Sequence, residues 1–496
     1  MRQEILRMES VCCLEQGVVQ LDDFNLSILS GEIMGLLMVN NHGLTSLLRL
    51  LQRNTPLHYG YVYYREKQAN TWRTSKLRKN RIGLIQSESC LVEGLTVADN
   101  IFVLRPGFKT WLLRPHVFKE QLAPVLASIG ISISAEAYIE ELTDFERVVV
   151  DVLKSVMAGC KLIVLRDIST DICEAELMKI YRLLQHYARE GISFLYIDFH
   201  FEGLQQICDK VALMSNGRII KVLQGESLRP ESLYAYTGAY IGRVRQKIHR
   251  PEPSRREDGS LFQVKNISGE MINGLSFSVS SGECVVLQNV DIQVFGELLD
   301  ILGGEAALRG GEMLIDGKTA DLNMGGDIAV IQELPTKTML FNELCYFDNL
   351  CFQLDRRMPE IWRDAKVREG VRREYAGVLG NDVFDMRVDA LTETQKYHLV
   401  YTRIALQNPK VVFCVQPFRR ADMELRMHIM ELLRMLLDKG IALVILTVNL
   451  ADCLTLADKL IRIRRDQPEE IYSRGEFSEI PISAPWIDLY RESDNW

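Results

Sequence analysis

No apolar stretch in this sequence approaches the roughly 20 residues that a membrane-spanning helix needs, and the N-terminal segment MRQEILRMESV has no apolar signal-peptide core. We therefore expect any membrane role to go through a protein partner. An excess of positive charge is also missing, because the formal net charge is -8. Nucleic-acid surfaces need a basic field, so this balance argues against a general nucleic-acid role. The local basic run RTSKLRKNR is more typical of a solvated face.

CxxC pairs are absent as well. The 11 cysteines are odd in number and scattered, and only Cys12 and Cys13 are adjacent. This pattern predicts reduced, mostly buried thiols in a cytoplasmic protein. What the sequence does have is length: 496 residues with 47% apolar content predict about two large cores.

The sequence repeats itself. SGEIMGLL at 30–37 recurs as SGECVVLQ at 281–288, and the Leu-Thr pair at 142–143 recurs at 391–392. Between the copies, residues 242–260 are polar, basic and proline-containing, which is typical of an exposed linker. The repeat predicts a first domain at 1–241 and a second domain at 261–496.

Short apolar runs alternate with helical patterns in each copy. KLIVL at 161–165 and FLYI at 194–197 have strand composition, and a helical pattern separates them. The second copy matches with VVFCV at 411–415, a helical segment and ALVILT at 442–447. Buried parallel strands joined by crossover helices predict an α/β fold for each copy.

The order of these segments resembles the nucleotide-binding subunit of an ABC transporter, and the tandem arrangement resembles the double-cassette ATPases of bacterial ribose and galactose importers. The resemblance rests on GEIMGLLMVNNHGLTSLLRLL, ELTDFERVVVDVLKSVMAGCKLIVLRDIST and their counterparts in the second copy, and it covers nearly the whole chain. It implies two P-loop NTPase-type domains, each with a helical subdomain, the first at about 88–155. It also implies ATP and Mg²⁺ as cofactors and a membrane permease as partner.

The stretch MVNNHGLTS at 38–46 matches the phosphate-binding motif GxxxxGK[ST] only in part. Gly43 is kept, and Thr45 and Ser46 keep the hydroxyls. Leu44 replaces the lysine that neutralises the β- and γ-phosphates. The resemblance places nucleotide contacts at Asn40, Asn41, Gly43, Leu44, Thr45, Ser46, Thr143 and Thr392, and metal contacts at Thr45 and Ser87. A turn whose helix is started by Thr45 or Ser46, without any ligand, is the alternative interpretation.

The second copy and the catalytic positions depart further from the family. At 289–296 both glycines of the motif are lost, and Phe295 occupies the lysine position, where it is expected to fill a phosphate cavity. The family's metal-binding aspartate and catalytic glutamate align with Arg166 and Asp167 in the first copy and with Val415 and Gln416 in the second. An arginine repels Mg²⁺, and a glutamine cannot take a proton.

The signature loop LSGGQ aligns with LTDFE at 142–146 and LTETQ at 391–395. An acidic residue replaces the first glycine in both copies, which predicts repulsion of a triphosphate. Each copy still satisfies the capping box T-x-x-[EQ], so we expect helices to begin after Thr143 and Thr392.

Further positions of the family's nucleotide site also carry different residues in this sequence. The metal-sensing glutamine aligns with Ser87, one place after Gln86, and Glu333 stands in the matching turn of the second copy. The switch histidine aligns with Phe199 and Val448. His200 follows Phe199, and because the strand period is two we expect it to be a surface residue. Glu15 replaces the aromatic residue that stacks on adenine.

These substitutions lead us to predict a pseudo-ATPase, with ATP binding weak or absent. It would be a tandem cassette that acts by binding proteins: a sugar-importer permease, a related active cassette protein or a regulator of sugar uptake. LVEGLTVADNIF at 91–102 and FNELCYFDNLCF at 341–352 preserve the family pattern at the permease-gripping region. The alternative is a subunit that still energises sugar import by ATP hydrolysis at one composite site. We expect a cytoplasmic location, peripheral at the inner face of the cell membrane through a partner.

Overall fold

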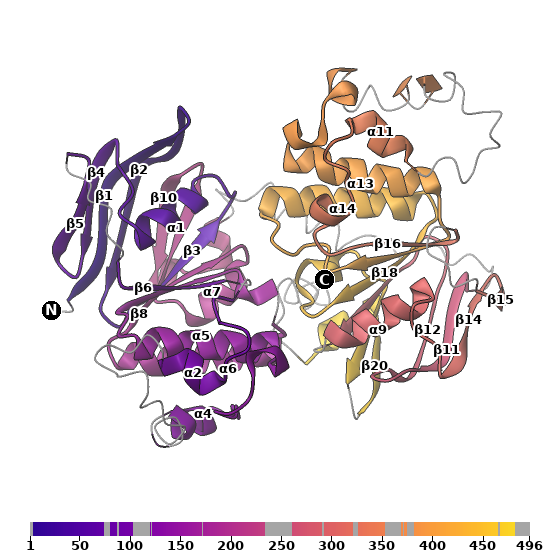
Figure 1. The fold of residues 1–496 in the computed structure, drawn as a ribbon, viewed down its shortest axis with the longest axis horizontal. Coiled ribbons are helices and arrows are strands. Elements are labelled where there is room, and N and C mark those ends of the chain that lie inside the picture. The colour runs from indigo at the N-terminus through magenta and orange to yellow at the C-terminus, as the bar shows by residue number, and fades with distance from the viewer. Residues whose placement is uncertain are drawn as a thin grey trace. The chain divides into compact units, whose positions relative to one another are not determined.

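The computed structural model describes residues 3–73, 80–86, 89–102, 120, 122–170, 172–233, 260–289, 292–320, 326–352, 369–370, 372–373, 381–464 and 467–481. The chain divides into two compact units (Figure 1). The first is made mainly by Met1–Arg243, and the second mainly by Val244–Ala421 and Leu425–Pro481. The predicted linker lies outside the described residues except for Ser260.

Each unit contains two sheets. In the first unit, a four-stranded antiparallel sheet has the order β2-β1-β4-β5, and a six-stranded sheet has the order β10-β9-β3-β8-β7-β6. The strands are β1 (Glu4–Glu15), β2 (Val18–Leu29), β3 (Ile33–Met38), β4 (Tyr59–Tyr64), β5 (Lys67–Thr71), β6 (Ile82–Gln86), β7 (Leu162–Arg166), β8 (Ser193–Asp198), β9 (Lys210–Ser215) and β10 (Arg218–Gln224).

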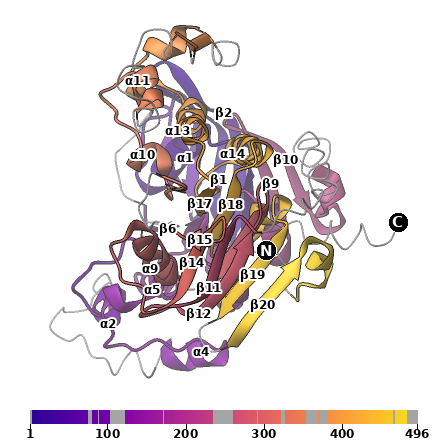
Figure 2. The ribbon, with the colours of Figure 1, turned by 90° about the vertical axis from the view of Figure 1, so that its right-hand side faces the viewer.

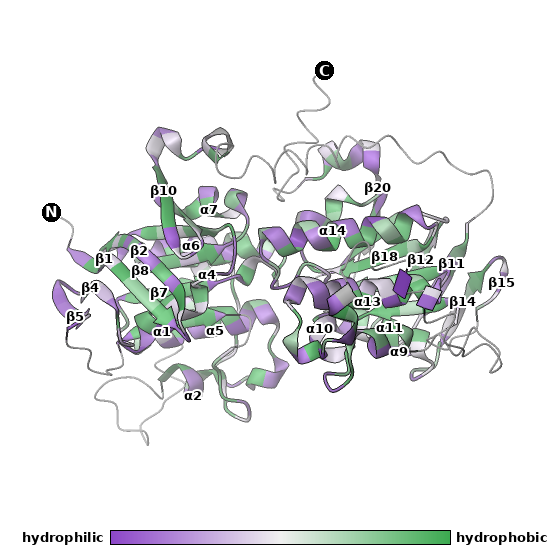
Figure 3. Cartoon of the chain, turned by 90° about the horizontal axis from the view of Figure 1, so that it is seen from above, coloured by the Kyte–Doolittle hydropathy of each residue, from purple (hydrophilic) through white to green (hydrophobic). Residues whose placement is uncertain are grey.

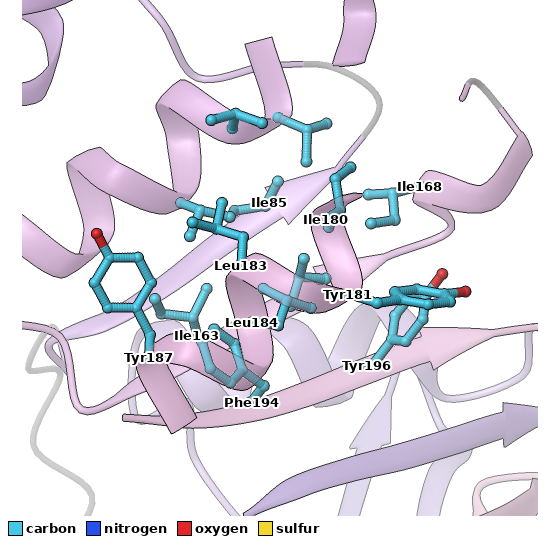
Figure 4. Packing of buried hydrophobic residues seen from close by; sticks show 14 of the residues in the cluster. Ile85, Ile163, Ile168, Ile180, Tyr181, Leu183, Leu184, Tyr187, Phe194 and Tyr196 are labelled. Atoms are coloured by element: carbon cyan, nitrogen blue, oxygen red, sulfur yellow. The ribbon is translucent and has the colours of Figure 1, made fainter. Parts of the chain in front are cut away.

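The helices of the first unit lie between its strands in the sequence. They are α1 (Leu44–Gln52), α2 (Val97–Phe102), α4 (Ala123–Ser128), α5 (Asp144–Met157), α6 (Glu174–Arg189) and α7 (Phe201–Ile207), with short 3₁₀ turns that include η4 (Ile168–Thr170). One core joins β6, β7 and β8 to α5 and α6, and Figure 4 shows part of its packing, with Tyr181 of α6 beside Tyr196 of β8. A second core joins the antiparallel sheet to α1.

The second unit repeats this plan. Its antiparallel sheet has the order β12-β11-β14-β15, and its six-stranded sheet has the order β16-β17-β18-β13-β19-β20 (Figure 2). The strands are β11 (Phe262–Ser268), β12 (Asn273–Val279), β13 (Cys284–Asn289), β14 (Gly310–Ile315), β15 (Lys318–Thr319), β16 (Ile328–Ile331), β17 (Val411–Val415), β18 (Ala442–Thr447), β19 (Lys459–Arg464) and β20 (Gln467–Ser473). The helices are α9 (Ile292–Gly303), α10 (Pro335–Thr338), α11 (Tyr346–Cys351), α13 (Glu393–Gln407) and α14 (Met423–Asp438).

The predicted βαβ units are confirmed. β7 and β8 pair in parallel with α6 between them, and β17 and β18 pair in parallel with α14 between them. The middle residues of these central strands are buried on both faces, which is why their sequences are mainly apolar (Figure 3). All 11 cysteines are free and seven of them are buried, as the scattered pattern predicted.

No described helix combines the length and the apolar character that crossing a bilayer requires.

Candidate functional site

The loop between β3 and α1 holds most of the predicted nucleotide contacts. The loop is bound to β9 and to the turn that follows it. The Val39 N–H donates to the carbonyl of Met214 on β9 at 2.9 Å. The Asn40 side chain donates to Asn216 Oδ1 at 2.9 Å and accepts from the Asn216 N–H at 3.1 Å. Asn41 is half-buried, and its carbonyl accepts from the Leu44 N–H at 3.2 Å. Several hydrogen-bonding groups of this loop are therefore already paired with other groups of the protein.

Gly43 has a structural reason to be glycine that needs no phosphate. Its φ is +81°, and a Cβ there would lie 2.2 Å from the carbonyl oxygen of Gln20 on β2. The left-handed backbone and the close approach to β2 both exclude other residues. The retained glycine is thus explained by the packing of the loop against the antiparallel sheet.

Leu44 points into the hydrophobic core. Its side chain is 1% exposed and belongs to the cluster that joins α1 to the antiparallel sheet. The matching residue of the second unit, Phe295, is also 1% exposed and belongs to the equivalent core. The expectation that Phe295 fills space rather than lining a phosphate site agrees with this burial. At both lysine positions the fold uses an apolar core residue.

The expectation that Thr45 or Ser46 starts the helix is wrong. Helix α1 begins at Leu44, with Gly43 as its N-cap residue and without a side-chain cap. The backbone turn at Gly43 leads the chain directly into the helix, so no hydroxyl is needed for capping. Thr45 is exposed, whereas Ser46 is 4% exposed and donates to Glu15 Oε1 at 2.8 Å. Of the two hydroxyls, only that of Thr45 faces solvent.

Glu15 makes a second contact with α1. Arg49 Nη1 lies 3.1 Å from Glu15 Oε1, so the carboxylate at the end of β1 bridges two residues of the helix. The sequence identified Glu15 only as a replacement for an aromatic residue. Its partners, Ser46 and Arg49, follow one another at helical spacing, but nothing in the local sequence links them to β1.

The two catalytic positions adopt the same unusual backbone. Asp167 and Gln416 directly follow β7 and β17, and their φ values are +52° and +41°. Each N–H donates at 2.9 Å to the neighbouring strand, to Ile197 in the first unit and to Leu446 in the second. Both side chains are 5% exposed. Backbone strain of this kind persists only where the surrounding structure enforces it, so both units enforce the same geometry at this strand end.

The switch position is filled by core residues. Phe199 and Val448, which align with the family histidine, are each 3% exposed. The prediction that His200 is a surface residue is wrong, because it is 3% exposed. Strand β8 ends at Asp198, so the alternation of faces stops there, and His200 becomes the N-cap residue of α7.

His200 lies against Asp198, with its Nδ1 3.6 Å from Asp198 Oδ1. The Phe199 and His200 N–H groups also donate to that oxygen, at 2.6 and 3.0 Å. Burial alone would raise the pKa of the Asp198 carboxyl, but hydrogen bonds and charge from His200, with a contribution from Ser169, hold it below its ordinary value.

Gln86 and Arg166 are directly opposite one another in the register of β6 and β7. Gln86 lines a cavity of about 50 Å³ together with Ser89, Asp144, Arg147, Val148, Asp151 and Ile168. This volume admits a few water molecules and not a nucleotide. Ser87, the predicted metal-sensing position, lies outside the described residues.

An ion pair occupies the corresponding region of the second unit. Glu333 follows β16, Arg419 follows β17, and their side chains pair directly with one another. Hydrogen bonds of Gln288 also connect the end of β13 to its neighbours. Gln288 donates to the Val448 carbonyl at 3.0 Å and accepts from Arg462 at 2.9 Å. In the described part of the chain, no group of three or more His, Cys, Asp or Glu side chains is placed to hold a metal ion.

The signature loops do start helices, as the capping boxes predicted. Thr143 accepts from the Glu146 N–H at 3.2 Å and is the N-cap residue of α5, and Thr392 does the same for Gln395 and α13 at 3.3 Å. The acidic residue of the second loop is held by its own unit, since Glu393 contacts Thr336 at 3.1 Å and Lys396 at 3.0 Å.

A pair of buried asparagines, which sequence reasoning missed, shapes the loops that precede α2 and α11. Asn100 accepts from the Val92 N–H at 2.8 Å and donates to the Val92 carbonyl at 3.1 Å. Asn349 makes the same two bonds with Phe341, both at 2.9 Å. Both asparagines are fully buried. The signal was present in the sequence as the Asp-Asn pair repeated in TVADN and CYFDN.

The comparisons with known proteins agree with this architecture. Residues 21–167 match the ABC transporter family. A ribose import ATP-binding protein from Rubrobacter xylanophilus is 22% identical over 97% of this chain and 98% of its own length. One from Rhizobium johnstonii is 24% identical over 92% and 91%. A xylose import ATP-binding protein from Geobacillus kaustophilus is 21% identical over 97% and 98%.

The chain is a tandem-cassette relative of these import proteins. A solved structure of an archaeal ribosome recycling factor, in complex with a ribosomal stalk protein, matches 93% of the tandem cassette chain and 89% of its own, with a TM-score of 0.57 and 14% identity. That likeness shows the fold alone: two ABC-ATPase-like domains in one polypeptide.

Proposed function

We propose that this tandem cassette protein does not depend on ATP hydrolysis for its function. It acts in carbohydrate uptake by binding another protein, either a membrane permease or a related active cassette protein. The observation that carries the proposal is the burial of Leu44 and Phe295. Both stand where the family places a phosphate-binding lysine, and both are 1% exposed core residues. Neither unit therefore has the lysine that would neutralise the phosphates of a bound nucleotide at this position.

The free energy of the missing contacts supports weak or absent nucleotide binding. A charge-assisted hydrogen bond contributes about 1.5–3 kcal/mol, and about 1.4 kcal/mol corresponds to a tenfold change in affinity. Loss of the lysine together with the metal-binding aspartate therefore costs on the order of 10²–10⁴ in affinity.

The loops before α2 and α11 support a docking role. Asn100 and Asn349 fix the backbone of these loops at equivalent places, and each loop presents an apolar side chain to solvent: Val92 is 50% exposed and Phe341 is 45% exposed. Around Phe341, Leu344 is 38% and Phe352 is 42% exposed, and the two phenylalanine rings are 4.5 Å apart. Rigidly held, exposed apolar residues are typical of protein interfaces. A permease bound here would place the chain at the inner face of the membrane.

A second candidate function is ATP hydrolysis at one composite site. Its support is limited to the first unit, where the Thr45 hydroxyl is exposed and Asp167 follows β7. This candidate predicts saturable ATP turnover that Thr45→Ala and Asp167→Asn each abolish. Turnover no higher than that of heat-inactivated protein would exclude it.

The docking proposal is tested by co-purification of the full chain with a sugar-importer permease in mild detergent. Phe341→Ser and Val92→Ser are expected to reduce recovery of the permease at least tenfold without lowering Tm. Ile471→Ser is the matched control, because Ile471 is 57% exposed on β20, outside these loops. Equal loss of recovery in all three variants, or no permease with the unmodified chain, would contradict the proposal.

A further inference from the structure

The turn between β11 and β12 surrounds a carboxylate with backbone N–H groups. The N–H groups of Met271 and Ile272 each donate to Glu297 Oε2 at 2.8 Å, and the Glu270 N–H donates to Glu297 Oε1. Glu297 belongs to α9, which follows the degenerate phosphate loop of the second unit. Three consecutive amides that converge on one group form an anion-binding nest.

Two features of the turn make room for an anion and hold the N–H groups in place. A Cβ on Gly269 would lie 2.2 Å from Glu297 Oε1, so the absence of a side chain there leaves room for the carboxylate. The turn is closed by the Gly269 N–H, which donates to the Ile272 carbonyl at 2.9 Å. Partial burial would raise the pKa of the Glu297 carboxyl, but the three N–H groups, with Arg309, hold it below its ordinary value.

The first unit shows that the fold does not require this arrangement. Ser46 stands at the position that matches Glu297, on the helix after the phosphate loop. There the polarity is reversed: the hairpin supplies the carboxylate of Glu15, and the helix supplies the donor, Ser46. Both units connect the helix to the hairpin, but only the hairpin of the second unit offers donors to an anion.

We propose that the turn 269–272 is a binding site for small oxyanions, such as a phosphate or a carboxylate, and that the Glu297 carboxylate is its resident ligand. The nest recognises two oxygens of a planar or tetrahedral anion through hydrogen bonds to its N–H groups. Since Glu297 is tethered, it outcompetes dissolved anions in the unmodified protein. An external oxyanion takes its place when the Glu297 carboxylate is removed.

The test uses the full chain with Glu297→Ala, and it measures Tm at rising concentrations of inorganic phosphate or acetate, with sodium chloride at matched ionic strength as the control. Glu297→Ala is expected to lower Tm by a few degrees, and 100 mM phosphate is expected to restore about 5 °C, as for a ligand with a Kd of about 1 mM. The unmodified chain is expected to show no phosphate-specific shift. Calorimetric titration of Glu297→Ala with phosphate is expected to show one site.

The control that defines the site is the double variant Glu297→Ala with Gly269→Ala, because the added Cβ occupies the space of the bound oxygen. Its phosphate-specific gain in Tm is expected to vanish. A gain that persists in the double variant, or no gain in folded Glu297→Ala, would overturn the proposal. If Glu297→Ala does not fold, hydrogen exchange at the amides of 270–272 decides. We expect protection in the unmodified chain and lower protection in Glu297→Gln, which keeps one acceptor oxygen and replaces the other by a donor. Fast exchange in the unmodified chain would contradict the site.

Discussion

The hydroxyl of Ser46 donates to the carboxylate of Glu15 across 2.8 Å, and this contact joins the helix after the phosphate loop to the end of β1. In a working ATPase of this family, an adenine-stacking aromatic is expected at the position of Glu15. Here the same two elements hold a carboxylate between them, with Arg49 as its counter-ion. In the first unit, an internal polar contact thus joins these two elements.

Leu44→Lys tests whether restoring the motif residue restores a site or breaks a core. Because Leu44 is 1% exposed, a lysine there buries a charge without a partner, and we expect a loss of about 2–4 kcal/mol in the free energy of unfolding. Thr45→Lys, one residue along on the exposed face of α1, is expected to change stability by less than about 0.5 kcal/mol. Denaturant unfolding measures both. Equal effects of the two variants would show that Leu44 is not a core residue.

Asn349→Ala and Asn100→Ala test the loops that present Phe341 and Val92. Each removes a buried amide that binds both the N–H and the carbonyl of the presented residue, so we expect a loss of about 1–3 kcal/mol in the free energy of unfolding. The same variants are expected to weaken permease recovery, because the loop is no longer held. A thermal unfolding curve and the co-purification assay report the two effects, and unchanged values of both would refute the role assigned to the asparagines.

Arg426 and Asp452 form a buried ion pair in the second unit, with 2.8 Å between Arg426 Nη1 and Asp452 Oδ2 and side chains that are 1% and 0% exposed. Asp452→Asn removes this charged partner of a buried guanidinium, and we expect a loss of about 3–5 kcal/mol in stability. Asp316→Asn, at the exposed pair with Lys410, is expected to cost less than about 1 kcal/mol. Urea unfolding at one pH compares the two losses, and a cost for Asp452→Asn as small as that for Asp316→Asn would count against this account.

His398 should make the second unit sensitive to acid. Burial, with the nearby His428, lowers its pKa to about 4, and its Nδ1 lies 3.1 Å from the Tyr346 hydroxyl. The unfolded chain takes up a proton near pH 6.5 while the folded chain does not, so stability is lost as pH falls from about 6.5 towards 4. The slope of this contribution is at most about 1.4 kcal/mol per pH unit.

His398→Asn keeps an acceptor for Tyr346 and removes the titration. The variant is expected to show a shallower loss of stability between pH 6.5 and 4.5, measured by urea unfolding at each pH. An unchanged slope would show that other groups dominate acid unfolding.

The local pattern of the sequence was enough to predict several central strands and the two helix starts at the signature loops. Residues 411–415 and 442–447 were predicted as strands and are β17 and β18 with those bounds, because fully buried parallel strands are continuous apolar runs. The capping boxes at Thr143 and Thr392 were also predicted correctly, since a capping box lies within four consecutive residues.

Contacts between distant segments could not be predicted in this way. The contact of Glu15 with Ser46, and that of Glu297 with the turn 269–272, depend on how a hairpin packs against a helix. His200 was mispredicted because the rule of alternating faces applies only within a strand, and β8 ends two residues before it. The burial of Leu44 required knowing that the backbone turn at Gly43 directs the helix into the core.

Calorimetric titration of the full chain with ATP, with and without Mg²⁺, tests the central claim most directly. The account predicts no measurable heat at millimolar nucleotide, because Leu44 and Phe295 are core residues. Micromolar, Mg²⁺-dependent binding that Thr45→Ala abolishes would contradict it, and would show that the first unit has built a nucleotide site without the lysine.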